Sequence, residues 1–273
     1  MTKKTYVITG AGSGIGLELV RALAQDDNTI FAGYRSEKSV EDLKNISGNI
    51  FPFYVDYDKP ETIKPATEFI KSNCNHIDTL VNGAGCVVAG PVEIVEMDEI
   101  RHQFNVNILG HIELTQGLVD YLDNGRIINI SSMASFGLFP FISPYCVSKR
   151  ALDMFFNTFL IENKRNIKVI SIKPGIITTP LWEKSVKANI KYLGNCKDYE
   201  KEMELVIRSA RKSETNGSKP QDVVNVILKA DAAKKPKLSY TVGNDALMAY
   251  IVSKLPQKII NHIIKTMLKS RLR

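Results

Sequence analysis

Cysteine is scarce in this 273-residue chain and is never clustered. The four residues, Cys74, Cys86, Cys146 and Cys196, form neither a CxxC pair nor a Cys/His group with the spacing of metal ligands. A disulfide framework and a structural zinc site both require such groups, so we expect reduced thiols and no bound metal.

Long apolar runs are also missing. No stretch approaches the roughly 18 consecutive apolar residues of a membrane-spanning helix. The opening MTKKTYVITG soon reaches glycines, which leaves no room for the apolar core and cleavage site of a secretory signal. The hydrophobic content of 44% and charged content of 24% are typical of globular proteins. We therefore expect a cytoplasmic protein.

Excess positive charge is absent from most of the chain. The formal net charge is +7, but the segment from Ala246 to Arg273 alone holds six basic residues and no acid, which leaves about +1 for the rest. These residues are Lys254, Lys258, Lys265, Lys269, Arg271 and Arg273. Because a general nucleic-acid surface needs basic residues across the domain, we expect no nucleic-acid partner.

Short apolar runs alternate with helical patterns along most of the chain. We predict strands over 5–9, 29–34, 49–56, 77–85, 125–132, 167–175 and 238–242, with helices over 17–25, 39–46, 60–73, roughly 96–122 and 145–164. Such βα alternation predicts an α/β fold, a doubly wound, Rossmann-like parallel sheet of about seven strands with helices on both faces. No linker or repeat interrupts it, so we expect residues 1–273 to form a single domain. Ligands of such sheets bind beyond the carboxyl ends of the strands.

A glycine-rich loop, TGAGSGIG, joins the first predicted strand to the first helix. Gly10, Gly14 and Gly16 give the spacing GxxxGxG rather than GxGxxG. Glycines let the backbone turn sharply and approach a ligand, and the free N–H groups of a helix start favour a pyrophosphate. A tight turn without a ligand is the alternative. The strand before and the helix after favour a dinucleotide site, which also includes Ser13 and Ile15.

A carboxylate is missing where the second strand ends. NAD sites of this kind usually place an acid there for the ribose hydroxyls, whereas this chain has Tyr34, Arg35 and Ser36. Arginine can form a bidentate pair with a 2′-phosphate and stack on adenine, so we expect NADP(H) in preference to NAD(H). Otherwise Arg35 is a solvated loop cation. Asp56, which closes the third strand, is either an acceptor for the adenine amino group or a turn residue.

Three further residues have a joint spacing that suggests catalysis. Ser132 ends the fifth strand, and Tyr145 and Lys149 lie four residues apart on the next helix, so they share one face. Singly, the tyrosine is a packed aromatic, the lysine is solvated and the serine is a strand-end hydroxyl for which Ser131 competes. In a chain that also contains a dinucleotide-binding loop, the same three residues together predict a catalytic group.

Together these motifs resemble the short-chain dehydrogenase/reductase family, in its single-domain YxxxK branch. TGAGSGIG, NVN ending at Asn107, Ser132, YCVSK and KPGIITTP stand in family order over residues 5 to about 180. The resemblance implies that Asn107, Ser132, Tyr145 and Lys149 are catalytic. It adds to the cofactor site Asn82, Gly83, Ala84, Tyr145, Lys149, Pro174, Gly175, Ile177 and Thr179, with Thr178 as a competitor for the last place. It also implies a homo-oligomer, either a dimer or a tetramer.

One motif departs from the family pattern. The fourth strand of the family usually ends NNAG or CNAG, and here it reads VNGAG, with Gly83 in place of the second asparagine. We expect the backbone contact to the cofactor ribose to survive. The side-chain bonds that steady the strand end would be lost, unless Asn82 substitutes.

The chemistry of these residues agrees with hydride transfer between a nicotinamide cofactor and a carbonyl or alcohol. A free tyrosine has a pKa of about 10, and we expect Lys149 and oxidised nicotinamide to lower the pKa of Tyr145. Tyr145 is then the general acid or base, Ser132 holds the substrate oxygen, Lys149 also binds the nicotinamide ribose, and Asn107 helps to position a water. A catalytically silent NADP(H)-binding regulator is the alternative, which the intact set opposes. Enoyl reductases of this fold space their tyrosine and lysine more widely.

Two regions bear on substrate choice. Residues 181–220 are predicted to form a lid, with Leu181, Trp182, Val186, Ile190, Tyr192 and Leu193 on one face. Phe136, Leu138, Phe139 and Phe141 either wall the pocket or belong to the core or a subunit contact. If they wall it, the substrate is lipophilic, such as a steroid, a retinoid or a long-chain alcohol.

The C-terminal segment 245–273 is predicted to form basic amphipathic helices. The stretch YTVGNDALMAYIVSKLP resembles the tail of steroid and retinol dehydrogenase-like members. Beyond it an apolar stripe consists of Ile259, Ile260, Ile263, Ile264, Met267 and Leu268. The stripe predicts either a helix on a membrane surface, hence peripheral membrane association, or a helix packed on its own domain or another subunit. Packing is the simpler interpretation.

Overall fold

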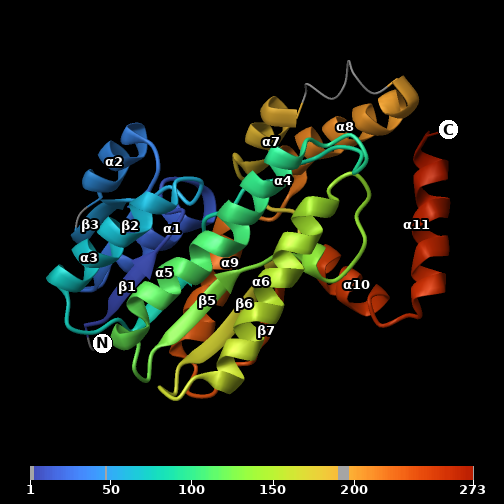
Figure 1. The fold of residues 1–273 in the computed structure, drawn as a ribbon. Coiled ribbons are helices and arrows are strands. Elements are labelled where there is room, and N and C mark those ends of the chain that lie inside the picture. Colours follow the sequence, from blue (N-terminus) through green and yellow to red (C-terminus); the bar gives the residue numbers. More distant parts are fainter. Residues whose placement is uncertain (1–2, 47, 190–196, 273) are drawn as a thin grey trace.

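The structure, a computed structural model, describes residues 3–46, 48–189 and 197–272 (Figure 1). Seven parallel strands form one sheet in the order β3-β2-β1-β4-β5-β6-β7. They are β1 (Thr5–Ile8), β2 (Thr29–Tyr34), β3 (Asn49–Tyr54), β4 (Thr79–Asn82), β5 (Arg126–Ile130), β6 (Lys168–Pro174) and β7 (Ser239–Val242). The predicted doubly wound parallel sheet is confirmed.

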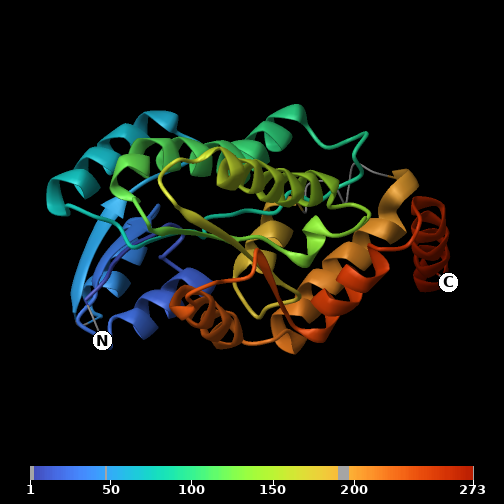
Figure 2. The same cartoon turned by 90° about the horizontal axis from the view of Figure 1, so that it is seen from below.

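Helices cover both faces of the sheet (Figure 2). The described helices are α1 (Gly14–Leu23), α2 (Glu37–Lys44), α3 (Ile63–Asn73), α4 (Met97–Phe104), α5 (Gly110–Leu118), α6 (Ser143–Glu162), α7 (Leu181–Asn189), α8 (Glu200–Asn216), α9 (Pro220–Ala232), α10 (Asn244–Val252) and α11 (Gln257–Leu272). One buried cluster joins α1 and α9 to the sheet, and a second joins α3, α5 and α6 to the opposite face.

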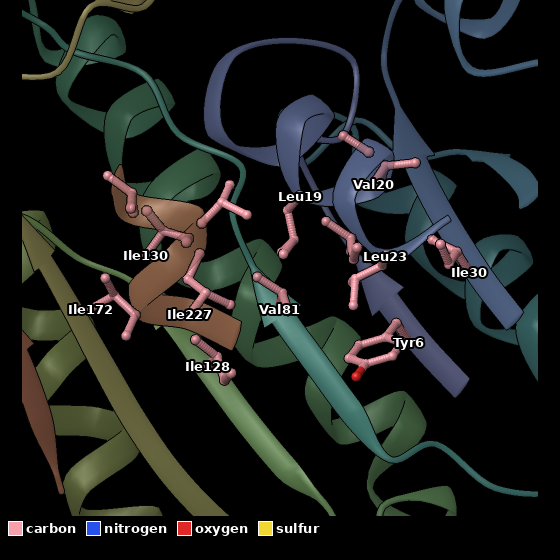
Figure 3. Close-up of a cluster of buried hydrophobic side chains, with 14 of the residues drawn as sticks. Tyr6, Leu19, Val20, Leu23, Ile30, Val81, Ile128, Ile130, Ile172 and Ile227 are labelled. Carbon is pink, nitrogen blue, oxygen red and sulfur yellow. The ribbon is translucent and has the colours of Figure 1, made fainter. Parts of the chain in front are cut away.

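Alternation along the central strands supplies both clusters. In β1, Ile8 packs with α1 and α9, while its neighbour Val7 packs with α3 and α5. Ile128 and Ile127 of β5 divide in the same way. Successive strand side chains point to opposite faces, so a central strand covered on both sides is apolar throughout. Figure 3 shows the first cluster, where Leu19 and other α1 residues lie over the strands.

Helix α9 is an element that the sequence reading missed. It begins with Pro220 at its first turn, and the Lys219 N–H donates to the Asp222 carboxylate at 3.0 Å. Proline at a helix start and an acid in the first turn are both start signals, so the information was present in the sequence. The helix buries Val223, Val224, Ile227 and Ala230 and packs against α1.

The strand order reverses between β1 and β4, and this reversal creates a crevice at the carboxyl ends of the strands. A cleft of about 590 Å³ lies there. It is lined by the glycine loop, the end of β2, the β4 loop, Ser132, Tyr145 and α7. None of the helices in the described ranges is both long and apolar enough to cross a membrane.

The last two helices lie at the margin of the molecule, on the side of the sheet where β7 lies (Figures 1 and 2). Helix α11 contacts α8 and buries Ile260. Ile263, Ile264 and Leu268 are half-buried, whereas Ile259 and Met267 of the same stripe are exposed. The predicted packing on the chain's own fold therefore holds for part of the stripe only.

Candidate active site

The glycine loop forms an anion-binding turn at the start of α1. Gly10 has a φ of +69°, and a Cβ on Gly16 would lie 2.3 Å from the carbonyl oxygen of Gly10, so neither position accepts a side chain without a shift. Ser13 makes no side-chain capping bond to α1 within the described structure. The first N–H groups of the helix are therefore left without that cap, in the arrangement that binds a pyrophosphate. The loop fits the dinucleotide predicted for it.

The end of β2 forms another wall of the cleft. Tyr34 packs edge-on against Tyr54, with ring centroids 5.9 Å apart, and Arg35 is exposed beside it. The hydroxyl of Ser36 lies 2.8 Å from that of Ser39. Asp56 lines the cleft and also accepts the Asp58 N–H at 3.2 Å, so it is a turn residue, while its role as an acceptor for adenine stays a prediction.

The β4 loop shows how the chain accommodates Gly83. A Cβ at this position would lie 2.6 Å from the carbonyl oxygen of Thr9, so the asparagine usual in the family does not fit this backbone without a shift. Asn82 does bridge neighbouring strands, because its Nδ2 donates to Oδ1 of Asn129 at 2.9 Å. The Thr9 hydroxyl accepts from the backbone N–H groups of Gly83 and Ala84 at 3.1 and 3.3 Å.

His111 of α5 also holds this loop, although no motif singled it out. Its Nε2 lies 2.9 Å from the Ala84 carbonyl oxygen, and its ring packs edge-on against Tyr57. Burial and the nearby Lys149 lower the pKa of His111 to about 3. The imidazole is therefore neutral near pH 7 and donates from Nε2, which fixes a loop that lines the cleft. Thr9 and His111 lie on separate elements, so only the folded chain brings them to Gly83.

Ser132 and Tyr145 meet in the cleft, as predicted. Burial raises the pKa of Tyr145 to about 12, and its hydrogen bond with Ser132 partly opposes this rise. Ser132 also accepts the Ala134 N–H at 3.1 Å. The competing Ser131 hydroxyl is buried without a partner in the described structure, so Ser132 is the serine joined to the tyrosine.

Lys149 is buried beside Tyr145 rather than solvated. Its Nζ donates to the Ile130 carbonyl oxygen at 2.8 Å and lies 5.9 Å from the centroid of the Tyr145 ring. Burial lowers the pKa of Lys149 to about 8, and the Asp153 carboxylate opposes this shift. The expected lowering of the tyrosine pKa is thus not a property of the protein alone, because the cost of burying a phenolate outweighs the neighbouring groups.

Asn107 is fully buried in a π-helical turn, Asn105–Leu109, between α4 and α5. Its Oδ1 accepts the Cys86 N–H at 2.9 Å, and its Nδ2 donates to the Cys86 carbonyl and to the Ser148 hydroxyl, both at 3.0 Å. A Cβ on Gly85 would lie 3.5 Å from both Asn107 Oδ1 and Lys149 Nζ. Asn107 therefore lies beside Lys149, while positioning of a water stays a prediction.

The end of β6 and the segment after it close the cleft with Pro174, Gly175, Ile177 and Thr179. The hydroxyl of Thr178 donates to the carbonyl oxygens of Gly217 and Ser218 at 3.2 and 2.9 Å, so Thr179 is the threonine left facing Gly14. Sequence reasoning missed Asp245, whose carboxylate accepts the Ile176 N–H at 2.6 Å and anchors this segment to the start of α10.

A buried ion pair beneath the site was also missed. Lys173 Nζ lies 2.7 Å from Asp153 Oδ2, and the two side chains are 11% and 6% exposed. Lys173 also donates to the Ser135 hydroxyl at 3.2 Å and lies 4.4 Å above the Phe136 ring. The pair therefore joins α6, which carries Tyr145 and Lys149, to the end of β6 and to the turn after Ser132.

Helix α7 covers the cleft with apolar side chains. Leu181 and Trp182 line it and pack with Phe139 in the cluster that contains Tyr145. Ser185 and Asn189 hold the helix to the Val87 carbonyl at 2.9 and 3.2 Å. Of the other predicted lid residues, Val186 is half-buried, and Ile190, Tyr192 and Leu193 lie outside the described ranges.

Of the four residues that were candidates for the pocket wall, only Phe139 packs in the cluster that contains Tyr145. Phe141 packs against Tyr199, Phe136 packs against Tyr250, and Leu138 is 50% exposed. None of the four lines the cleft, so the second interpretation of this stretch, packing in the core or at a subunit contact, agrees better with the structure than a pocket wall. The apolar lining comes instead from the segment that follows the β4 loop, with Val87 and Val88, and from α7, with Leu181 and Trp182.

This fold and cleft define a nucleotide-dependent oxidoreductase of the doubly wound α/β class. The chain matches the short chain dehydrogenase family over residues 4–190 and belongs to that family. It is 27% identical to the 3-ketodihydrosphingosine reductase of Bacteroides thetaiotaomicron, over 97% of this chain and 98% of that protein. It is 28% identical to the NADPH-dependent 3-dehydrocapnine reductase of Ornithobacterium rhinotracheale, over 89% of each chain. A short-chain dehydrogenase structure from Streptomyces avermitilis superimposes with a TM-score of 0.78 at 21% identity, covering 99% of this chain and 98% of that one.

Proposed function

We propose that this oxidoreductase uses NADP(H) to interconvert a ketone or aldehyde with an alcohol on a lipophilic substrate. The observation that carries the proposal is the convergence of Ser132, Tyr145 and Lys149 in a cleft that continues into the glycine loop. A hydroxyl donor, a proton donor and a cation at one point match the needs of a carbonyl oxygen that gains negative charge.

Each residue has a distinct role in this proposal. A bound nicotinamide cofactor supplies the hydride for reduction or accepts it in oxidation. The Ser132 hydroxyl donates a hydrogen bond to the substrate oxygen, and the Tyr145 hydroxyl gives that oxygen its proton. With a pKa of about 12, Tyr145 holds the proton until charge develops on the substrate. Lys149, with a pKa of about 8, is largely charged at pH 7 and stabilises the tyrosinate that is left.

The residues at the end of β2 support NADP(H). Arg35 is an exposed cation beside the cleft, next to the hydroxyl of Ser36. A guanidinium and a hydroxyl form the donor set for a 2′-phosphate, and no carboxylate follows directly after β2 to favour a free ribose hydroxyl. The relative named as NADPH-dependent is consistent with this preference.

The apolar lining around Tyr145 supports a lipophilic substrate. Val87, Val88, Leu181 and Trp182 form this part of the cleft, and burying apolar surface against them favours an apolar ligand. The relative named for 3-ketodihydrosphingosine is consistent with a lipophilic ketone. We include residues 181–220 in the proposal as the substrate lid of a single domain spanning 1–273.

The remaining parts of the proposal concern the state of the protein in the cell. We propose a cytoplasmic homo-oligomer, in keeping with the family. The exposed apolar side chains of α6 support a subunit contact, and they are Val147, Met154, Phe155 and Ile161. Light scattering coupled to size-exclusion chromatography tests this part, since a monomer at all concentrations would contradict it.

The test of the reaction separates an enzyme from a silent cofactor-binding protein. Tyr145→Phe should abolish turnover of a panel of apolar ketones and aldehydes with NADPH, while NADPH binding measured by calorimetry stays unchanged. Tyr121→Phe is the matched control: it also removes a tyrosine hydroxyl, on the short helix Val119–Tyr121 before β5, and should keep full activity. Equal and negligible turnover of the wild type and of Tyr145→Phe across the panel would instead support the silent regulator.

A further inference from the structure

We propose that α10 and α11 dock on the surface of an anionic lipid bilayer. The binding itself is independent of the proposed reaction, whereas its use, collection of a lipophilic substrate from the bilayer, rests on the proposed function. Three features of the segment carry the inference: its exposed apolar side chains, its charge and its connection to the cleft.

Exposed apolar side chains gather on this segment. They are Leu247, Met248, Tyr250 and Ile251 of α10, Leu255 of the turn, and Ile259 and Met267 of α11, each between 40% and 60% exposed. In α10 the exposed positions 247, 248 and 251 lie on one side of the helix, opposite the buried Ala246. A continuous apolar side on a peripheral helix needs a partner, because it is exposed to water in the chain itself.

The charge of the segment selects the partner. Lys254, Lys258, Lys265, Lys269 and Arg271 are all exposed, and no acid lies among residues 246–273. A second copy docked symmetrically on this segment would bring the same basic residues against each other without a carboxylate to pair them. A bilayer with anionic headgroups offers negative charge and an apolar interior at one surface, which matches both properties of the segment.

The segment is directly connected to the cleft. Asp245 at the start of α10 holds the Ile176 N–H at 2.6 Å, and this bond fixes the loop that lines the cleft. In the same helix, Tyr250 packs edge-on against Phe136, with ring centroids 5.2 Å apart, on the loop that leads from Ser132 to Tyr145. Docking through α10 would therefore bring a bilayer close to the loops that surround the catalytic residues.

Sedimentation of the full chain with phospholipid vesicles tests the proposal. The two vesicle compositions are phosphatidylcholine alone and phosphatidylcholine mixed with phosphatidylserine. We expect binding to the mixed vesicles, weakened by salt. The double variant Lys258→Gln/Lys265→Gln should bind about fivefold more weakly for each lysine removed. Met248→Ser/Ile251→Ser should lower binding to the mixed vesicles several-fold as well, because both side chains lose apolar contact with the bilayer.

Matched controls carry the same chemical changes elsewhere. Lys235→Gln/Lys237→Gln removes two exposed lysines before β7, at the opposite end of that strand from α10, and Met97→Ser removes an exposed apolar side chain of α4. Both controls should bind vesicles like the wild type. Circular dichroism checks that each variant is folded. We expect folding to be kept, because the substituted side chains are exposed.

Several results would overturn the docking proposal. The first is that the wild type sediments with neither kind of vesicle. The second is that the control variants lose as much vesicle binding as the α10 and α11 variants. The third is that the α10 and α11 variants have a lower oligomeric mass than the wild type, which would mean that a second copy covers the segment. Turnover of a water-soluble ketone is measured in parallel. A folded protein that binds vesicles but reduces no ketone counts against the proposed reaction and leaves the docking intact.

Discussion

Replacing Lys173 with methionine tests how the buried ion pair supports the site. The change keeps most of the length of the unbranched side chain but removes the ammonium group, which lies 2.7 Å from Asp153 Oδ2 and also donates to the Ser135 hydroxyl. Asp153 is 6% exposed, and its Oδ1 accepts no hydrogen bond within the described structure. The carboxylate would then be left buried without its closest cation.

The magnitude follows from this burial. Removing one partner of a buried pair typically costs about 3–5 kcal/mol, whereas replacing both partners by apolar residues is often neutral or stabilising. We therefore expect Lys173→Met to lower the free energy of unfolding by about 3–5 kcal/mol. The double variant Lys173→Met/Asp153→Leu should recover most of that loss, to within about 1 kcal/mol of the wild type.

The same variants should move the pH dependence of turnover in opposite directions. The pKa of Lys149 is about 8, so the rate of carbonyl reduction should fall as the pH rises through this value and the ammonium is lost. Asp153 raises the pKa of Lys149. Without its own cation, in Lys173→Met, Asp153 should move the fall to higher pH. Without Asp153, in the double variant, the fall should move to lower pH.

Urea unfolding followed by circular dichroism and initial rates between pH 6 and about 10 provide the two readouts. Exchange of an exposed ion pair, Arg101→Met with Asp98→Leu, controls for removing charges as such. An unfolding free energy of Lys173→Met within about 1 kcal/mol of the wild type would refute the reasoning on burial. A double variant with an unshifted pH profile would refute the link between Asp153 and Lys149.

Three other changes test single contacts. Arg35→Ala should raise the KM for NADPH about tenfold or more and leave the KM for NADH unchanged, since a charge-assisted bond is worth about 1.5–3 kcal/mol. Lys38→Ala is the control. An equal rise of the KM for both cofactors would contradict a contact between Arg35 and the 2′-phosphate. Gly83→Asn should lower the unfolding free energy by about 1–3 kcal/mol, because the Cβ of the new asparagine would lie 2.6 Å from the Thr9 carbonyl oxygen. An unchanged denaturation midpoint would show that the end of β4 adapts to the side chain. Asp245→Ala should weaken NADPH binding in calorimetry while the far-ultraviolet dichroism stays the same, because the loop after β6 loses an acceptor; unaltered affinity would show that the loop holds its own position.

Features that depend on neighbouring residues were determined by the sequence itself. The four-residue spacing of Tyr145 and Lys149 places both side chains on one side of α6 whatever the helix packs against. The glycine loop likewise prescribes a sharp turn into a helix, and the apolar runs prescribe strands buried on both faces. Helical period, backbone freedom and strand alternation are local properties, which is why the sheet and most of the cleft were predictable.

Choices between adjacent residues were decided by the tertiary structure. The Thr178 hydroxyl donates to carbonyl oxygens of a distant segment, Gly217 and Ser218, which leaves Thr179 to face Gly14. Ser132 forms a hydrogen bond with Tyr145 of the next helix, whereas the Ser131 hydroxyl is buried without a partner among the described residues. The pairing of Lys173 with Asp153 joins α6 to β6, so no spacing along the chain announces it.

The protonation of Tyr145 has the same origin. A tyrosine four residues before a lysine suggests a lowered pKa, yet burial in the folded chain raises the pKa to about 12 and lowers that of Lys149 to about 8. Desolvation depends on everything that packs around a group, whereas spacing reports only its neighbours along one helix. The sequence thus determined which residues meet, and the packed fold decided how they hold their protons.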